Sequence, residues 1–63
     1  MPILQVEILK GRTTEQKREM VSKVTEAVSE TLDCPKDAVT IIIREMDKED
    51  LGKAGYLYGE RED

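Results

Sequence analysis

Histidine, tryptophan and phenylalanine are absent from this chain, and cysteine occurs only once. Without histidine or a second cysteine, the chain lacks the usual ligands of a structural zinc site and can form no internal disulfide. The lone Cys34 fits a reducing compartment, and we interpret it as incidental because no histidine exists to activate its thiol. We therefore predict a cytoplasmic protein without a bound metal.

Long hydrophobic runs and an excess of positive charge are also missing. The longest apolar stretch, residues 38–43, contains Thr40 and is far shorter than the roughly 20 residues that span a bilayer. Glu7 and Lys10 interrupt the N-terminal apolar stretch, which argues against a signal peptide. The formal net charge of −4 argues against nucleic acid and anionic membrane surfaces, which bind basic patches. We expect neither as a partner.

The length of 63 residues allows one domain, residues 1–63. A chain of this size buries only about 60% of the surface that it exposes when unfolded, which is marginal for a lone monomer. With disulfides and metal excluded, oligomerisation is the remaining common way to stabilise it. The sequence therefore predicts a homo-oligomer.

The first half of the chain has the pattern of a strand followed by a helix. Residues 3–9 alternate, with Leu4, Val6 and Ile8 on one fully apolar face. Thr13, followed three residues later by Gln16, is typical of a helix N-terminus with a capping box. Apolar residues at helical spacing then predict a helix over residues 14–32.

The second half predicts a strand and a short hairpin. Residues 39–43 are dense in β-branched side chains, which is typical of a strand buried on both faces. Gly52 and Gly55 bracket a turn, residues 56–58 are a brief terminal strand, and residues 59–63 form a flexible tail. The predicted fold is α/β (α+β): a right-handed βαβ subunit with parallel strands and a C-terminal hairpin.

Pro2 is the most informative single residue. Initiator methionine is usually trimmed before a residue as small as proline, and trimming would leave Pro2 as a free secondary amine at the head of a strand. A free α-amino group has a pKa of roughly 7.7–8.0, so it can act as a general base near neutral pH. If Met1 stays, the Pro2 nitrogen is an amide and this chemistry is impossible. Taken alone, Pro2 is better explained as a residue whose missing N–H suits a strand start.

Several short motifs in a fixed order carry a family likeness. From Pro2 to about Gly55 the chain resembles the 4-oxalocrotonate tautomerase family. The residues that carry this resemblance are Pro2, Gly11-Arg12, Thr13 with Glu15-Gln16-Lys17, residues 24–29, Leu32-Asp33 with Pro35, Glu45-Met46, and Gly52 with Gly55.

The resemblance implies a fold, an assembly and an activity. Two βαβ subunits would share a four-stranded sheet, and three such dimers would make a hexamer. The implied reaction is cofactor-free keto–enol tautomerisation of small unsaturated 2-oxo or 2-hydroxy acids, with Pro2 moving the proton. Arg12 would reach in from a neighbouring subunit and hold a substrate carboxylate. Its planar guanidinium is suited to bind a carboxylate.

The pocket around Pro2 must keep its amine neutral. Burial among apolar groups and a nearby guanidinium both lower the pKa of an amine, and we expect Ile3, Leu9, Leu51 and Arg12 to act in this way. The family's best-known members carry a second arginine where this chain has Thr40, and an aromatic residue where it has Leu51. Thr40 donates one neutral hydrogen bond, so a monocarboxylate is favoured over a dicarboxylate.

Three alternatives are open at this point. Relatives with an N-terminal proline hydrate or dehalogenate short unsaturated acids with an extra carboxylate, for which Glu45 and Asp50 are candidates. The chain is alternatively an accessory, non-catalytic subunit of a hetero-oligomer. A ribbon-helix-helix DNA-binding protein is disfavoured by the acidic balance and by the β-branched segment where that fold needs a helix.

Overall fold

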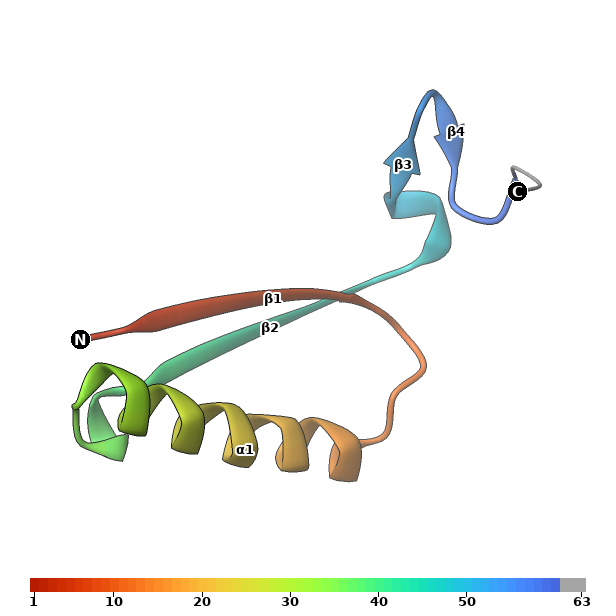
Figure 1. Ribbon diagram of the computed structural model, residues 1–63. Coiled ribbons are helices and arrows are strands. Elements are labelled where there is room, and N and C mark those ends of the chain that lie inside the picture. The colour runs from red at the N-terminus through yellow and green to blue at the C-terminus, as the bar shows by residue number, and fades with distance from the viewer. Residues whose placement is uncertain (61–63) are drawn as a thin grey trace.

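The computed structural model describes residues 1–60 of the chain. Strand β1 (Ile3–Leu9) leads into helix α1 (Thr14–Leu32), which returns to strand β2 (Thr40–Met46). Beyond β2 the chain forms a small hairpin of strands β3 (Gly52–Lys53) and β4 (Tyr56–Leu57). Figure 1 shows α1 lying along one side of the β1–β2 pair, with the hairpin beyond the far end of β2.

Strands β1 and β2 are parallel and pair over their whole length. The register aligns Ile3 with Thr40 at one end and Leu9 with Met46 at the other. Because parallel strands need a long crossover, the 19-residue helix between them completes a βαβ unit. The predicted fold is confirmed.

The predicted helix start is confirmed in atomic detail. Gln16 N–H donates to the Thr13 hydroxyl oxygen (3.1 Å), and Thr13 N–H donates to the Gln16 side-chain oxygen (2.9 Å), which closes a capping box. The helix ends at Asp33, whose left-handed backbone (φ 54°) lets its N–H reach the Ser29 carbonyl. The helix thus spans residues 14–32, as its pattern predicts.

A single copy covers the second strand on one face only, and burial of its other face, which other copies of the chain would provide, stays a prediction. Ile41 and Ile43 face α1 and are half-buried, whereas Ile42 points the other way and is 37% exposed. The reason is that α1 covers only one face of a two-stranded sheet (Figure 1). The strand also runs on to Met46, past the apolar residues, because β1 offers it backbone partners up to Leu9.

The predicted C-terminal hairpin is present and small. Gly52 pairs with Leu57 and Lys53 with Tyr56 in antiparallel register. Tyr58, expected in the terminal strand, follows β4 in a turn, although its N–H still donates to the Leu51 carbonyl (2.8 Å). Of the predicted tail, residues 59–60 belong to this turn region, and residues 61–63 lie outside the described part of the chain.

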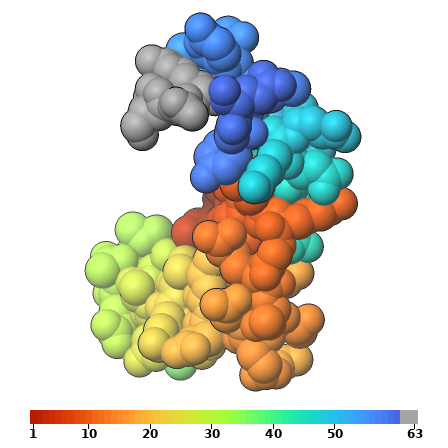
Figure 2. Space-filling view, turned by 90° about the vertical axis from the view of Figure 1, so that its right-hand side faces the viewer, coloured from red at the N-terminus to blue at the C-terminus, as the bar shows by residue number. Residues whose placement is uncertain are grey.

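Residues 1–60 contain no fully buried side chain. Large apolar side chains stay open on the uncovered sheet face, where Ile3 is 55% exposed, and on the hairpin, where Tyr56 is 52% exposed. Figure 2 shows the hairpin standing apart from the helix, with the strands between them. A single copy therefore leaves the apolar surface that a second copy would cover.

Within residues 1–60, no helix is long and apolar enough to cross a membrane.

Candidate active site

Pro2 lies at the start of the β1–β2 pair. Its carbonyl oxygen accepts a hydrogen bond from Thr40 N–H (3.0 Å), which extends the parallel ladder by one residue beyond Ile3. Pro2 is half-buried, whereas Met1 before it is 89% exposed. The backbone of β2 thus fixes Pro2, while the Met1 side chain stays exposed.

Arg12 lies beyond the opposite end of the same strand. The chain leaves β1 at Lys10, whose N–H donates to the Met46 carbonyl (2.9 Å), and turns through Gly11 at φ 129°. This conformation favours glycine, since an L side chain there is strained. The Arg12 guanidinium then folds back and donates through Nη1 to the Leu9 carbonyl (3.4 Å).

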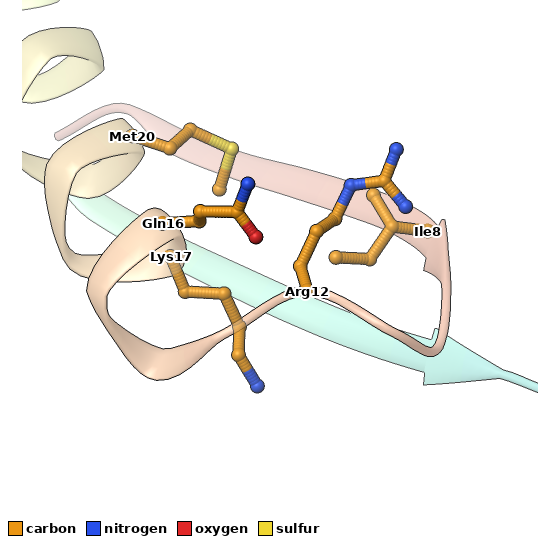
Figure 3. A pocket seen from close by; sticks show the side chains of 5 residues that line it. All are labelled: Ile8, Arg12, Gln16, Lys17 and Met20. Carbon is orange, nitrogen blue, oxygen red and sulfur yellow. The ribbon is translucent and has the colours of Figure 1, made fainter.

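Arg12 also borders a shallow cavity between the start of α1 and the end of β1. The cavity has a volume of about 150 Å³, and its lining residues are Ile8, Arg12, Gln16, Lys17 and Met20. Figure 3 shows the Arg12 guanidinium beside Ile8 and the Gln16 amide beside Met20, so that polar and apolar side chains alternate around the cavity. The arrangement offers hydrogen-bond donors beside apolar side chains, which suits a small carboxylate with a short hydrocarbon chain.

The charge of Arg12 is not neutralised within the described part of the chain. Arg18 pairs with Glu15, and Arg44 pairs with Glu7 (3.1 Å), but no carboxylate of residues 1–60 lies within ion-pair distance of Arg12. A guanidinium that is exposed and unpaired can bind an incoming carboxylate through two parallel hydrogen bonds. Arg12 therefore has the electrostatic setting that its predicted role requires.

The predicted site residues divide into two groups that lie far apart in one chain. Pro2 and Ile3 are beside Thr40, while Arg12 and Leu9 are at the other end of β1. The seven residues of β1 alone extend about 23 Å, which is farther than an arginine side chain reaches. A site that contains both Pro2 and Arg12 must therefore be built from two copies.

Leu9 and Leu51 belong to the Arg12 end of the molecule. Leu9 is half-buried opposite Met46, and Leu51 follows a short 3₁₀ turn (Lys48–Asp50) and is 36% exposed. Neither lies beside Pro2 of its own chain. Their expected place in the pocket around Pro2 stays a prediction that requires a neighbouring subunit.

Arg44 does not replace the second arginine that the sequence lacks. Its guanidinium donates to Glu7 (3.1 Å) and to Gln5 (3.3 Å) on the uncovered sheet face. Along β2 it is four residues, or roughly 13 Å, from Thr40. This ion pair satisfies Arg44 locally and leaves Thr40 as the polar side chain of β2 nearest to Pro2.

The two carboxylates considered for water activation have structural partners. Glu45 pairs with Lys17 at 3.1 Å, and Asp50 accepts a hydrogen bond from Asp47 N–H (3.1 Å) that caps a 3₁₀ turn. Neither carboxylate borders the cavity at Arg12. Within residues 1–60, no three or more acidic, histidine or cysteine side chains are grouped to hold a metal ion.

The sequence pattern did not point to Gln16 and Lys17 as residues of the cavity. Gln16 was recognised as a capping residue and Lys17 only as part of a motif, since both lie on the polar side of the helix pattern. Their position beside Arg12 follows from the tight turn into α1. No local pattern predicts the Lys17–Glu45 contact, because its partners are 28 residues apart.

Comparisons with known proteins show the family to which the chain is related. A family model described as tautomerase enzyme matches residues 2–61. A 2-hydroxymuconate tautomerase of Pseudomonas putida is 47% identical over 57 residues, which are 90% of each chain.

Solved structures extend the likeness to the fold. A 4-oxalocrotonate tautomerase isozyme from Methylibium petroleiphilum is 48% identical with a TM-score of 0.85, covering 89% of this chain and 88% of its own. A heterohexamer 4-oxalocrotonate tautomerase from Chloroflexus aurantiacus is 32% identical with a TM-score of 0.88, covering 95% and 97%.

Proposed function

The chain belongs to the tautomerase family and is a keto–enol tautomerase, and we propose that Pro2 is its general base and Arg12 its carboxylate-binding residue. The substrates are small unsaturated 2-hydroxy or 2-oxo acids, and the reaction needs no cofactor. The observation that carries this assignment is the unpaired Arg12 guanidinium at a cavity that apolar side chains help to line. The family relationship supports the keto–enol chemistry.

The proposed chemistry is a proton shuttle. After removal of Met1, the neutral amine of Pro2 accepts the proton of the enol hydroxyl as the C–O bond gains double-bond character. The same amine then returns that proton to carbon, so that neither atoms nor electrons are gained or lost. Arg12 stays cationic and holds the carboxylate, which fixes the distance between the reacting carbon and the amine.

The active unit is proposed to be a homo-oligomer, a hexamer built from dimers. The 23 Å or so between the two ends of β1 supports this, because one copy cannot bring Pro2 and Arg12 together. The exposed Ile3 and Ile42 on the uncovered sheet face, and the exposed hairpin, provide apolar surface for such contacts. A cytoplasmic location is part of the same proposal.

Within this substrate class we propose a preference for monocarboxylates. Some relatives are named 2-hydroxymuconate tautomerase, and 2-hydroxymuconate is a diacid. In this chain Thr40 is the β2 residue beside Pro2, and it brings no positive charge to that end. One carboxylate can pair with Arg12, while a second would find only a neutral hydroxyl donor.

The test is ultraviolet-monitored ketonisation of 2-hydroxymuconate and of a 2-hydroxydienoate with one carboxylate. Mature protein, checked for loss of Met1 by mass spectrometry, is compared with its Pro2→Ala variant. Turnover of the monoacid that disappears in the variant supports the proposal. Equal turnover by both proteins would contradict the role of Pro2.

The hydratase or dehalogenase alternative is not favoured. The relatives quoted above are tautomerases by name, and Glu45 and Asp50 have structural partners. The same preparation should leave 3-halo-substituted acrylates unchanged.

A further inference from the structure

The ion pair between Lys17 and Glu45 differs from the other ion pairs of residues 1–60. Its side chains are 28% and 30% exposed, whereas those of every other pair are at least half exposed. The pair joins the first turns of α1 to the end of β2 across 28 residues of sequence. It is thus the ion pair with the least solvent screening, and it links two layers of the fold.

This ion pair lies next to the short connection that carries Arg12. At its start, the Lys10 N–H donates to the Met46 carbonyl. At its end, the Thr13 carbonyl accepts a hydrogen bond from the first turn of α1. Lys17 N–H donates to the Thr13 carbonyl (3.1 Å), while the Lys17 ammonium binds Glu45. Lys17 therefore connects the end of the Arg12 connection to β2.

Lys17 does not take part in the carboxylate site through its own charge. Its side chain lines the cavity together with Arg12, but Figure 3 shows its ammonium pointing away from the Arg12 guanidinium. The ammonium is already paired with Glu45 at 3.1 Å. The charge of Lys17 is therefore committed to Glu45, and we expect it to act on substrate binding through the position of Arg12.

We infer that Lys17 is a positioning residue for Arg12 and acts through its ion pair with Glu45. The pair holds the start of α1 against β2, and the Thr13 carbonyl carries this constraint to Arg12. Without the pair, the connection gains freedom and the guanidinium is less often in place for the substrate. This inference rests on the proposed function for the role of Arg12 in binding a carboxylate.

The kinetic test uses two variants that break the pair and two controls. Lys17→Met and Glu45→Gln should each raise KM by about threefold to fivefold with little change in kcat, the size expected for a partly screened ion pair. Lys17→Arg keeps the pair and should stay close to wild type. Lys23→Met breaks the exposed pair with Glu19 on the same helix and should leave KM unchanged.

The coupling to Arg12 is tested in the Arg12→Ala background. If Lys17 acts through Arg12, Lys17→Met should add less than about a 1.5-fold change in KM there. A full threefold effect in that background would contradict the inference. An unchanged KM in Lys17→Met and in Glu45→Gln, each with Arg12 intact, would also contradict the inference.

Hydrogen exchange separates this inference from the proposed function, because it needs no substrate. The amides of Thr13 and Gln16 close the capping box, and they should exchange several-fold faster in Lys17→Met and Glu45→Gln than in wild type or Lys23→Met. Unchanged exchange overturns the inference even in a fully active enzyme. The variants can show faster exchange even if turnover does not depend on Pro2. That result would support the positioning role of Lys17 and contradict the proposed function.

Discussion

The two ends of the β1–β2 pair are built in different ways. At the Pro2 end the fixed contact is made by backbone, from Thr40 N–H to the Pro2 carbonyl, and no ion pair of residues 1–60 lies there. At the Arg12 end, Lys10 pairs with Asp47 (3.3 Å) and Lys17 with Glu45 (3.1 Å). The Pro2 end suits a neutral base, and the Arg12 end suits a cation that binds a carboxylate.

This difference supports the proposal that two copies share one site. A neutral amine is favoured by apolar surroundings, whereas a carboxylate needs an accessible cation. The chain separates these requirements by the length of a strand. A second copy can then bring the Arg12 end of one subunit to the Pro2 end of another, which also covers exposed apolar surface.

Removing the base should have the largest effect. Pro2→Ala in the mature protein is expected to lower kcat by about 100-fold or more, since a positioned general base contributes factors of this order. The same loss is expected when Met1 is retained, because the Pro2 nitrogen is then an amide. Steady-state ketonisation rates on samples of known N-terminal mass measure both. A kcat within threefold of wild type in either sample would contradict the assignment.

Removing the carboxylate-binding residue should come next. Arg12→Ala is expected to raise KM by about 10- to 100-fold, the cost of losing hydrogen bonds to a charged group. Its oligomeric state, measured by analytical ultracentrifugation, should be unchanged, because the proposed partner of Arg12 is the substrate carboxylate and not another subunit. If the variant instead dissociates, Arg12 is a structural residue of the assembly.

Adding a positive charge at the Pro2 end should allow both ends to bind a carboxylate. Thr40→Arg places a guanidinium beside Pro2 and is expected to raise kcat/KM for a diacid about tenfold relative to a monoacid. Thr40→Val is the matched control, since it keeps the backbone N–H that donates to Pro2 and the shape of the side chain. An unchanged ratio in Thr40→Arg would show that Thr40 does not set the preference.

The smallest effect is expected from weakening the helix start. Thr13→Ala removes the side-chain half of the capping box and should cost about 1 kcal/mol of unfolding free energy. Thr14→Ala, one residue along, serves as the control, with an expected change within about 0.5 kcal/mol. Urea unfolding of the two variants measures the difference. Equal stability would mean that the cap is not formed in solution.

The sequence predicted the elements better than their contacts. Alternation over residues 3–9 and the Thr13–Gln16 spacing are local signals, and both strand and capped helix are confirmed. Burial of the second strand is seen on one face only in a single copy, because the β-branched pattern indicates an apolar strand and does not say which element covers each face. The exposed Ile42 is therefore a feature that a single copy leaves open.

The candidate site was predictable by residue type and not by arrangement. Pro2 and Arg12 stand out from the start of the chain and from the resemblance to a family. Their separation follows from the length of β1, but the fixed contact of Pro2 with Thr40 depends on the strand register, which periodicity alone does not give. The Lys17–Glu45 pair likewise appears only when α1 is placed against β2.

The most direct measurement is subunit complementation. Pro2→Ala and Arg12→Ala are each inactivating at low substrate concentration, and the two proteins are unfolded together and refolded as a 1:1 mixture. If each site takes Pro2 from one copy and Arg12 from another, random mixing restores about a quarter of the wild-type activity, since half of the copies carry each intact residue. A mixture no more active than its separate components would contradict a site shared between copies.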